Sequence, residues 1–278
     1  MITTIVNGTF TDQISVTDRA LNYGDGVFET IAVHDKALHY WNEHYQRLQK
    51  GCDILGFSAP TESELLADIK KLTLFAGSSV IKIIVSRGQG GRGYLAAGVT
   101  QATTVITQHT WPEYVNRYQS QGIKSRICQH RLIINPALVG IKHLNRLDQV
   151  LARNEWHNDD IQEGFMLDCD ENITEGTCTN IFFKTNNEWI TPADSNCAVA
   201  GVMRAAVINK ASQTGLEIKQ QNIKLSELAA VTECFVCNSI WGVVPVLSCD
   251  SYHFEISDEL RQLQTELEQE IKSVSYVI

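Results

Sequence analysis

The chain has 278 residues, of which 44% are hydrophobic and 20% are charged, so it can bury the core of one or two ordinary globular domains. Its formal net charge of −9 disfavours nucleic acid or an anionic membrane as the main partner, because both require a basic surface. An anionic small substrate remains compatible with this charge, since a few arginines can make one pocket positive.

The N-terminal residues 1–8, MITTIVNG, do not combine a basic start with an apolar run, as a secretory signal would. No later stretch approaches the roughly 18 apolar residues of a membrane-spanning helix. We therefore expect a cytoplasmic protein that does not use a membrane as a partner.

The eight cysteines lack the regular spacing of a disulfide or metal framework. One pair, Cys234-x-x-Cys237, falls in an expected strand, where residues three apart point to opposite faces. We therefore expect no metal or redox site. The cysteines are Cys52, Cys128, Cys169, Cys178, Cys197, Cys234, Cys237 and Cys249.

Strands and helices alternate over the first third of the chain. A helix is predicted over residues 42–55, where apolar residues recur at helical spacing before Gly56. The capping box Thr61-x-x-Glu64 begins a second helix, whose apolar face should comprise Leu65, Ile69, Leu72 and Ala76. Strands are predicted over residues 2–6, 27–34, 80–85 and 103–107.

A polar stretch from Trp111 to Gln121 interrupts this pattern, and we interpret it as the connection between two α+β domains. The prediction is a smaller N-terminal domain over residues 1–112, a connection over 113–121 and a larger C-terminal domain over 122–278.

The C-terminal domain is also predicted to mix helices and strands. One helix should cover residues 145–157, and a second should begin at Gly201 and stop at Gly215. A last helix should carry Leu260, Leu263, Leu267 and Ile271 on one face. Strands are predicted over residues 164–168, 179–184, 187–190, 232–237 and 242–247.

Lys142 lies in an apolar setting just before a predicted helix. Desolvation there could lower the pKa of its amine and make it nucleophilic enough to form a Schiff base. The alternative is a lysine whose stem packs while its head reaches solvent, and the local sequence by itself favours that alternative.

Two further charged residues have both a functional and an ordinary interpretation. Arg47, beside the apolar stripe of the first helix, could bind a phosphate with two hydrogen bonds or could simply be solvated. Glu175 is expected at a turn between strands. If buried, it could hold the proton of a pyridine nitrogen; if exposed, it is only a turn residue.

Two glycine-containing segments are candidate ligand sites. The turn at Gly201-Val202-Met203-Arg204 begins a helix, whose free N–H groups can hold a phosphate, although most helix starts bind nothing. The loop Ser86–Tyr94 has neither a Walker lysine nor a dinucleotide-binding fingerprint in its proper context. A flexible loop with two arginines is better suited to holding carboxylates.

Taken together and in order, these segments resemble the fold type IV family of pyridoxal-phosphate enzymes. That family includes branched-chain aminotransferases, D-amino acid aminotransferases and aminodeoxychorismate lyases. Residues 18–30 resemble its N-terminal signature, and His44-x-x-Arg47-Leu48 resembles its phosphate-arginine helix. Two more selective segments, Ser86–Tyr94 and Ala137–Val150, resemble bacterial aminodeoxychorismate lyases, the second through the sequence GIKHLNRL. Phe28-Glu29-Thr30 is shared with the aminotransferases and does not discriminate.

The resemblance implies a two-domain α+β fold like that of D-amino acid aminotransferases, with pyridoxal 5′-phosphate between the domains and its lysine in the C-terminal domain. It also implies a homodimer in which the partner's N-terminal domain helps to close the pocket.

The same resemblance implies roles for individual residues. Lys142 would carry the cofactor as an aldimine, and Glu175 would keep the pyridine nitrogen protonated. The phosphate would be surrounded by Arg47, the backbone N–H groups of Val202 and Met203, and the side chains of Asn238 and Ser239. The substrate carboxylate would be held by Arg92, with Arg87 and Tyr94 as further candidates.

The implied activity is that of a carbon–oxygen lyase, which eliminates pyruvate from 4-amino-4-deoxychorismate and leaves p-aminobenzoate for folate synthesis. Lys142 would first remove the proton at the amine-bearing carbon and later return a proton to the departing enolpyruvate. One alternative is a branched-chain or D-amino acid aminotransferase, which would require a 2-oxo acid acceptor. Another is a cofactor-binding protein without catalysis, against which the intact Lys142 and Glu175 argue.

Overall fold

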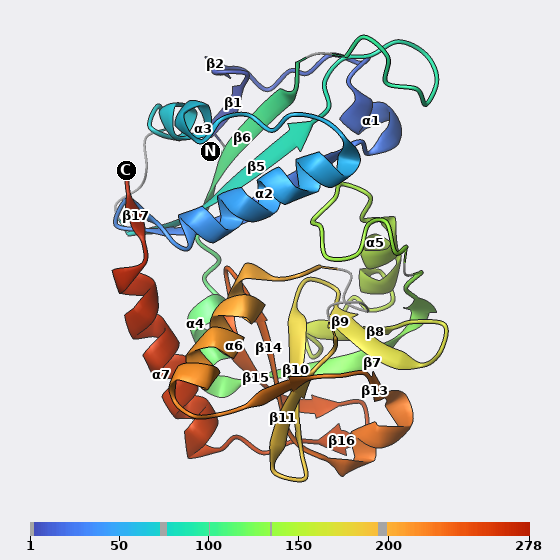
Figure 1. Ribbon diagram of the computed structural model, residues 1–278. Coiled ribbons are helices and arrows are strands. Elements are labelled where there is room, and N and C mark those ends of the chain that lie inside the picture. The colour runs from blue at the N-terminus through green and yellow to red at the C-terminus, as the bar shows by residue number, and fades with distance from the viewer. Residues whose placement is uncertain (1–2, 73–76, 100, 134, 194–198) are drawn as a thin grey trace. The chain divides into compact units, whose positions relative to one another are not determined.

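A computed structural model describes residues 3–72, 77–99, 101–133, 135–193 and 199–278, and Figure 1 shows its helices and strands. The chain forms two compact units. Unit 1 contains Met1–Pro112, Ile141–Asn145 and Val274–Ile278, and unit 2 contains Glu113–Gly140 and Arg146–Ser273. Cys197 and Ala76, which were assigned from the sequence, lie outside the described residues.

Unit 1 is built on a seven-stranded sheet of order β17-β4-β3-β5-β6-β1-β2. The long central strands are rich in β-branched Val, Ile and Thr residues, which favour extended backbone. Its strands are β1 (Thr3–Val6), β2 (Thr9–Phe10), β3 (Gly26–His34), β4 (Ala37–Leu38), β5 (Ser78–Ser86), β6 (Thr103–Thr110) and β17 (Tyr276–Val277). Its helices are α1 (Arg19–Tyr23), α2 (Trp41–Leu55) and α3 (Glu62–Ile69).

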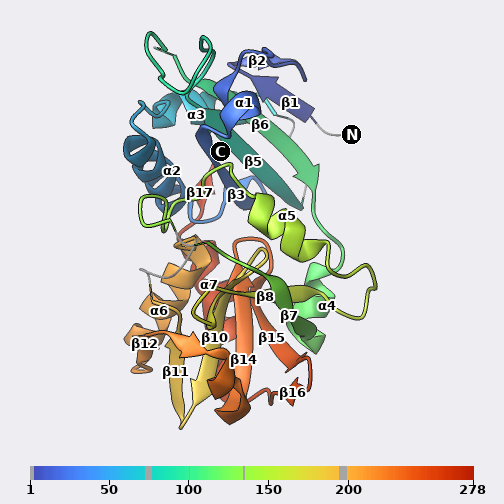
Figure 2. The ribbon, with the colours of Figure 1, turned by 90° about the vertical axis from the view of Figure 1, so that its right-hand side faces the viewer.

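Helix α2 lies along one face of this sheet, as the two views in Figures 1 and 2 show. Leu48 and Cys52, four residues apart on α2, are buried against Ile31 and Ile81 of the central strands. The prediction of α2 is confirmed. The predicted start of α3 is confirmed too, but the helix ends at Ile69, so Leu72, which was expected on its apolar face, is buried beyond the end of the helix. Gly56 ends α2 with a φ of 75°, and the capping box of Thr61 and Glu64 begins α3.

Unit 2 is built on a ten-stranded sheet of order β12-β11-β10-β14-β15-β7-β8-β9-β13, with β16 paired to β15. Its strands are β7 (Ile123–Arg131), β8 (Glu163–Leu167), β9 (Asn172–Gly176), β10 (Asn180–Thr185), β11 (Glu188–Thr191), β12 (Ile218–Gln220), β13 (Ile223–Lys224), β14 (Val231–Asn238), β15 (Gly242–Cys249) and β16 (Tyr252–His253). Its helices are α4 (Val115–Gln121), α5 (Leu147–Arg153), α6 (Val202–Gln213), the 3₁₀ helix η1 (Leu225–Ala230) and α7 (Asp258–Ser273).

Helices α6 and α7 pack side by side and against the central strands of this sheet (Figures 1 and 2). Strands β8 and β9 are buried along their whole length, so their side chains are covered on both faces. The predictions that α6 begins at Gly201 and that α7 buries Leu260, Leu263 and Leu267 are confirmed.

Several details differ from the sequence predictions, and strands β7 and β9 were not predicted. The stretch predicted to be a plain connection contains α4, whose Val115 is buried. Helix α5 covers Leu147–Arg153 instead of the predicted 145–157. Lys142, predicted in the C-terminal domain, lies in a segment that belongs to unit 1, because Val27 and His143 form an antiparallel bridge there.

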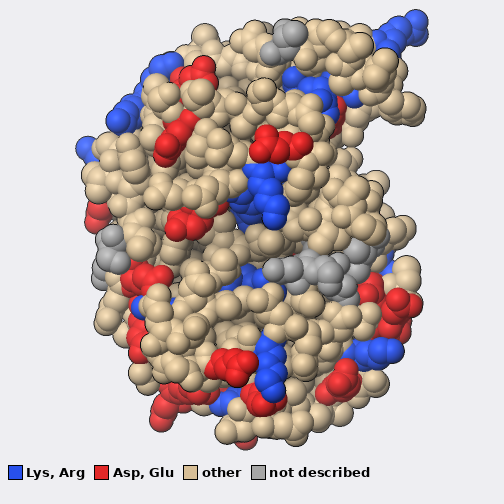
Figure 3. All heavy atoms as spheres, in the orientation of Figure 1, with Lys and Arg blue, Asp and Glu red and all other residues tan. Residues whose placement is uncertain are grey.

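The surface drawn in Figure 3 carries acidic and basic side chains interspersed over both units. Among the described residues, no helix combines the length and the apolar character needed to span a membrane.

Candidate active site

The segment that carries Lys142 is held to β3 by its backbone. The N–H of Phe28 donates to the carbonyl of Lys142, and the N–H of Leu144 donates to the carbonyl of Gly26, both at 2.9 Å. Gly26 permits this approach, because a Cβ atom there would lie 2.5 Å from the Val85 carbonyl and 2.9 Å from Leu144 Cδ1. The backbone position of Lys142 is therefore set by main-chain contacts with β3.

The side-chain amine of Lys142 lies over the ring of Phe28, with Nζ 4.4 Å from the ring centroid. An ammonium group at this distance is attracted by the negative face of the ring. Phe28 thus contacts both the backbone and the amine of the lysine, which restricts where the amine can lie.

Arg47 projects from α2 toward β3 and forms a two-pronged ion pair with Glu29. Arg47 Nε donates to Glu29 Oε1 at 2.8 Å, and Nη2 donates to Oε2 at 2.5 Å. His44, one turn earlier on α2, places Nδ1 2.6 Å from Glu29 Oε2. The Glu29 side chain is 1% exposed and that of Arg47 is 11% exposed.

The pKa values in this cluster follow from burial and charge. Burial by itself would raise the pKa of Glu29, but the charges and hydrogen bonds of Arg47 and His44 outweigh it and lower the pKa from 4.5 to about 2. Burial lowers the pKa of His44, and the cations of Arg47 and Lys142 act in the same direction, against the opposing effect of Glu29. Glu29 is therefore ionised and His44 neutral at pH 7.

Arg87 serves the local fold of unit 1. Its Nε donates to Asp25 Oδ2 at 2.8 Å, its Nη1 donates to the Gly56 carbonyl at 2.8 Å, and its Nη2 donates to the Leu55 carbonyl. These two carbonyls lie at the C-terminal end of α2, where helical carbonyls lack partners within the helix. The guanidinium that was predicted to bind substrate is thus engaged in capping a helix.

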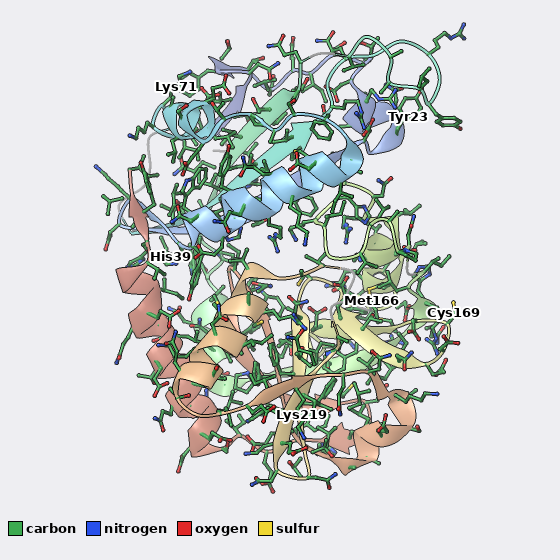
Figure 4. The ribbon with its side chains drawn as sticks, viewed as in Figure 1. Tyr23, His39, Lys71, Met166, Cys169 and Lys219 are labelled. Carbon is green, nitrogen blue, oxygen red and sulfur yellow. The ribbon has the colours of Figure 1, made fainter. Side chains whose placement is uncertain are left out.

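The loop after β5 carries the other two candidate substrate residues, Arg92 and Tyr94, and both are exposed. Arg19 holds this loop to α1 by donating to the carbonyls of Gly93 at 3.2 Å and Tyr94 at 2.9 Å. The ring of Tyr94 also meets Tyr23, labelled on α1 in Figure 4, edge to face with centroids 5.6 Å apart. The loop is therefore attached to α1 through Arg19, while the side chains of Arg92 and Tyr94 are exposed to solvent.

In unit 2, Glu175 lies within β9 and is buried, instead of occupying an exposed turn. The Nε2 atom of Gln149 and the backbone N–H of Val199 each donate to one of its oxygens at 3.1 Å. Its partner on the neighbouring strand is Met166, labelled on β8 in Figure 4. A buried carboxylate held by two donors fits the predicted role of a partner for a pyridine nitrogen.

The N-terminus of α6 depends on Gly201. This residue has no side chain with which to cap the helix, and a Cβ atom there would lie 1.9 Å from Asn180 Oδ1. Asn180 in turn donates to the Val199 carbonyl at 2.9 Å. The backbone N–H groups of Val202 and Met203 thus belong to the first turn of a twelve-residue helix, an arrangement suited to a phosphate.

Asn238 and Ser239 lie at the turn between β14 and β15. The Asn238 side chain accepts hydrogen bonds from the N–H groups of Ile240 at 2.9 Å and Trp241 at 2.7 Å, so it shapes the turn itself. Its amide also donates to the Cys178 carbonyl at 3.3 Å. Ser239 is partly buried beside it.

Four residues that hold or shape the candidate site were given no role in the sequence analysis. Glu163 is fully buried and accepts from the hydroxyls of Thr177 at 2.5 Å and Thr179 at 2.9 Å, which shapes the turn after Glu175. The others are Glu29, His44 and Gln149, all inside segments that were quoted as resembling the family. Glu29 has a signal in the sequence, because it is a charged residue within the largely apolar strand β3. Gln149 has none, because the apolar residues around it on α5 are largely exposed.

The structure therefore brings the predicted residues together in two sets. Unit 1 holds Lys142, Arg47, Arg87, Arg92 and Tyr94. Unit 2 holds Glu175, Val202, Met203, Asn238 and Ser239.

Comparisons with known proteins place this geometry in context. The sequence matches the family model described as amino-transferase class IV over residues 26–249. It is 32% identical to the aminodeoxychorismate lyase of Vibrio harveyi, across 94% of this chain and 98% of that protein. It is also 30% identical to a putative branched-chain-amino-acid aminotransferase of Methanocaldococcus jannaschii, across 88% of this chain and 87% of that protein.

Among solved structures, that of 4-amino-4-deoxychorismate lyase from Pseudomonas aeruginosa matches with a TM-score of 0.89 and 36% identity, covering 96% of this chain and 98% of that one. These likenesses confirm the fold type IV, mixed α and β architecture expected from the sequence, which the structure shows as two sheets with helices.

Proposed function

Since the chain belongs to the amino-transferase class IV family, we propose that it is an aminodeoxychorismate lyase that converts 4-amino-4-deoxychorismate to p-aminobenzoate and pyruvate. The observation that carries this proposal is the likeness to lyases of that name along nearly the full length of both chains. The loop Ser86–Tyr94 and the segment Ala137–Val150 support it, because they resemble lyases more closely than aminotransferases.

Enzymes of this family use pyridoxal phosphate, and the residues present fit that group. The two-pronged Glu29 pair holds the Arg47 guanidinium in place, and Gly201 leaves the first turn of α6 without a capping side chain. Both features suit a phosphate. The phosphate-binding residues would be Arg47, Val202, Met203, Asn238 and Ser239.

Glu175 would accept the proton of the pyridine nitrogen, since Gln149 and Val199 hold its carboxylate in a buried position. When bound, the cofactor supplies an electron sink that stabilises negative charge at the amine-bearing carbon. Lys142 would be the residue that joins the cofactor covalently, through an amine placed by the backbone of β3.

Lys142 would also move the protons of the reaction. Its amine would remove the proton from the amine-bearing carbon of the substrate, and the bond from the ring to the enolpyruvyl oxygen would then break. The protonated Lys142 would deliver a proton to the departing enolpyruvate, giving pyruvate. The ring becomes aromatic in the same step, which makes the elimination favourable.

Substrate binding would fall chiefly to Arg92, since a guanidinium can hold a carboxylate with two hydrogen bonds and Arg92 is exposed on an anchored loop. Tyr94 on the same loop would assist. Arg87 was predicted as a third ligand, but its hydrogen bonds to Asp25 and to the end of α2 support a structural role instead.

The proposal extends to the setting of the enzyme. A lyase with this product would serve folate synthesis in the cytosol. We also propose a homodimer, which is supported by exposed apolar side chains in unit 1 on α1 and on the loop after β5.

The decisive experiment is to supply purified enzyme carrying pyridoxal phosphate with 4-amino-4-deoxychorismate and no 2-oxo acid. Release of pyruvate and p-aminobenzoate in equal amounts is expected. An aminotransferase would instead require an acceptor and would turn over branched-chain or D-amino acids. Turnover that appears only after a 2-oxo acid is added would therefore contradict the lyase assignment.

A further inference from the structure

The carboxylate of Glu29 is a buried charge that has no part in the proposed reaction. Both of its oxygens are occupied, Oε1 by Arg47 Nε and Oε2 by Arg47 Nη2 and His44 Nδ1, at distances of 2.5 to 2.8 Å. Two parallel hydrogen bonds to one carboxylate fix the plane of a guanidinium as well as its position. Glu29 therefore determines the orientation of Arg47.

His44 adds to this without adding charge. An ionised carboxylate only accepts hydrogen bonds, so the hydrogen between the two groups must be on His44 Nδ1. In a neutral imidazole with its hydrogen on Nδ1, the other nitrogen, Nε2, can only accept a hydrogen bond. His44 Nε2 is buried and has no hydrogen-bond partner among the described residues. His44 thus steadies Glu29 while leaving Arg47 as the cation paired with it.

Exposure decreases from the guanidinium to the carboxylate. The Arg47 side chain keeps 11% exposure, whereas the side chains of Glu29 and His44 keep 1% each. Glu29 is thus shielded from any ligand that approaches from solvent, and Arg47 is the member of the cluster that a ligand can reach. An effect of Glu29 on a ligand must therefore pass through Arg47.

We propose that Glu29, supported by His44, is a positioning residue that fixes the Arg47 guanidinium for the phosphate of the cofactor. This inference rests on the proposed phosphate role of Arg47. Partners that orient the ligands of metal sites typically contribute on the order of 10- to 100-fold in affinity, and a partner that orients a phosphate ligand acts by the same principle. We expect a contribution of that size from Glu29, confined to the phosphate.

The competing explanation is purely structural, since the Glu29–Arg47 pair also joins β3 to α2. A structural anchor would affect every ligand of the site alike. A positioning residue would affect a ligand with a phosphate and spare one without it. Pyridoxal, which lacks only the phosphate, therefore separates the two explanations.

The experiment measures the dissociation constants of pyridoxal phosphate and pyridoxal for the full chain freed of cofactor, and for its variants Glu29→Gln, Arg47→Gln and the double variant. The ratio of the two constants reports the preference for the phosphate. We expect Glu29→Gln to lower this preference roughly 10- to 100-fold. The double variant should match Arg47→Gln, because Glu29 acts only through Arg47.

Glu233→Gln is the matched control, since Glu233 is likewise buried and paired with a cation, Lys184, at 2.9 Å. It should leave the preference unchanged. An equal loss of affinity for both ligands in Glu29→Gln, or losses that multiply in the double variant, would overturn the positioning role. If Arg47→Gln itself keeps the preference, the phosphate role of Arg47 fails and the inference fails with it. The lyase assay is independent of all these outcomes.

Discussion

Lys142 is placed by its backbone hydrogen bonds to β3, so its side chain can be changed without moving the segment that carries it. Lys142→Ala should lower the rate of pyruvate release by at least roughly 10²- to 10⁴-fold, the usual contribution of a general acid–base group. Lys142→Arg should be similarly impaired, because a guanidinium does not give up its proton near neutral pH.

The assay is pyruvate release by each purified variant with cofactor added, and Lys219→Ala is the control. Lys219, labelled in Figure 4, is an exposed lysine of β12 paired with Glu188. Near-normal turnover in Lys142→Ala with cofactor bound would rule out the proposed role.

The lowered pKa of Glu29 also predicts how the stability of the fold changes in acid. Its pKa is lowered from 4.5 to about 2 in the folded chain, so its ionised form stabilises the fold above pH 4.5. That contribution is lost progressively as the pH falls from 4.5 toward 2. Glutamine resembles a protonated glutamate, so Glu29→Gln should be less stable than the natural chain at pH 7 and should approach its stability near pH 2.

The measurement is the free energy of unfolding in urea at several pH values. Glu171→Gln is the control, because Glu171 is half exposed in its pair with Arg131 and should show little difference at any pH. A gap between Glu29→Gln and the natural chain that stays constant with pH would contradict the assignment.

At the scale of the elements, Arg87 was predicted to bind substrate, but it donates hydrogen bonds to the carbonyls at the C-terminal end of α2. Arg87 joins Asp25 to the last carbonyls of α2. Arg87→Ala should lower the free energy of unfolding by about 1–3 kcal/mol, as expected for hydrogen bonds that involve charged groups. Lys219→Ala, which breaks one exposed pair with Glu188, should have a much smaller effect on the free energy of unfolding.

Urea unfolding of both variants gives this comparison, and steady-state kinetics completes it. An increase in KM without loss of stability in Arg87→Ala would restore Arg87 as a substrate ligand.

The elements predicted correctly are those whose signals are local. Helix α2 has an apolar stripe and a terminal glycine, α3 has a capping box, and α6 begins at Gly201. The two-residue strand β17 has no comparable signal, because it forms by pairing with the distant strand β4. Strand β4 pairs with β3 across a short turn, but two residues are too few to show a pattern. Strand β9 was missed because it is buried on both faces, which removes the alternation that marks a half-exposed strand.

The residues of the candidate site also divide into those with a local sequence signal and those without one. Lys142, Arg47 and Glu175 were found because motifs surround them. The partners Glu29 and Gln149 were not assigned roles, because their function depends on which strand packs against which helix. The sequence reports that a charged residue lies in an apolar strand, but only the packing of α2 on β3 reveals what neutralises it.

At the scale of the whole molecule, the exposed apolar residues on α1 and on the loop after β5 predict self-association through that surface. Leu21 and Leu95 are 62% and 84% exposed, on α1 and on the loop that Arg19 ties to it. Burying such residues against a second copy would remove apolar surface from water. Leu21→Asp and Leu95→Asp should therefore shift the proposed homodimer toward monomer in sedimentation experiments.

Val277→Asp is a suitable control, since Val277 is 74% exposed on the two-residue strand β17. It should sediment like the natural chain. Identical sedimentation of all three variants would show that this surface is not where two copies meet.

The pairing of β17 with β4 joins residues 276–277 to residues 37–38. Unit 1 also contains residues 141–145, where His143 forms a bridge to Val27 of β3, so it is incomplete until these residues are made. A growing chain that emerges from the ribosome therefore cannot complete its first unit first, although N-terminal domains commonly fold during synthesis. The β4 edge of that sheet stays open until residues 276–277 are released, and a nascent chain stalled at residue 112 would display it.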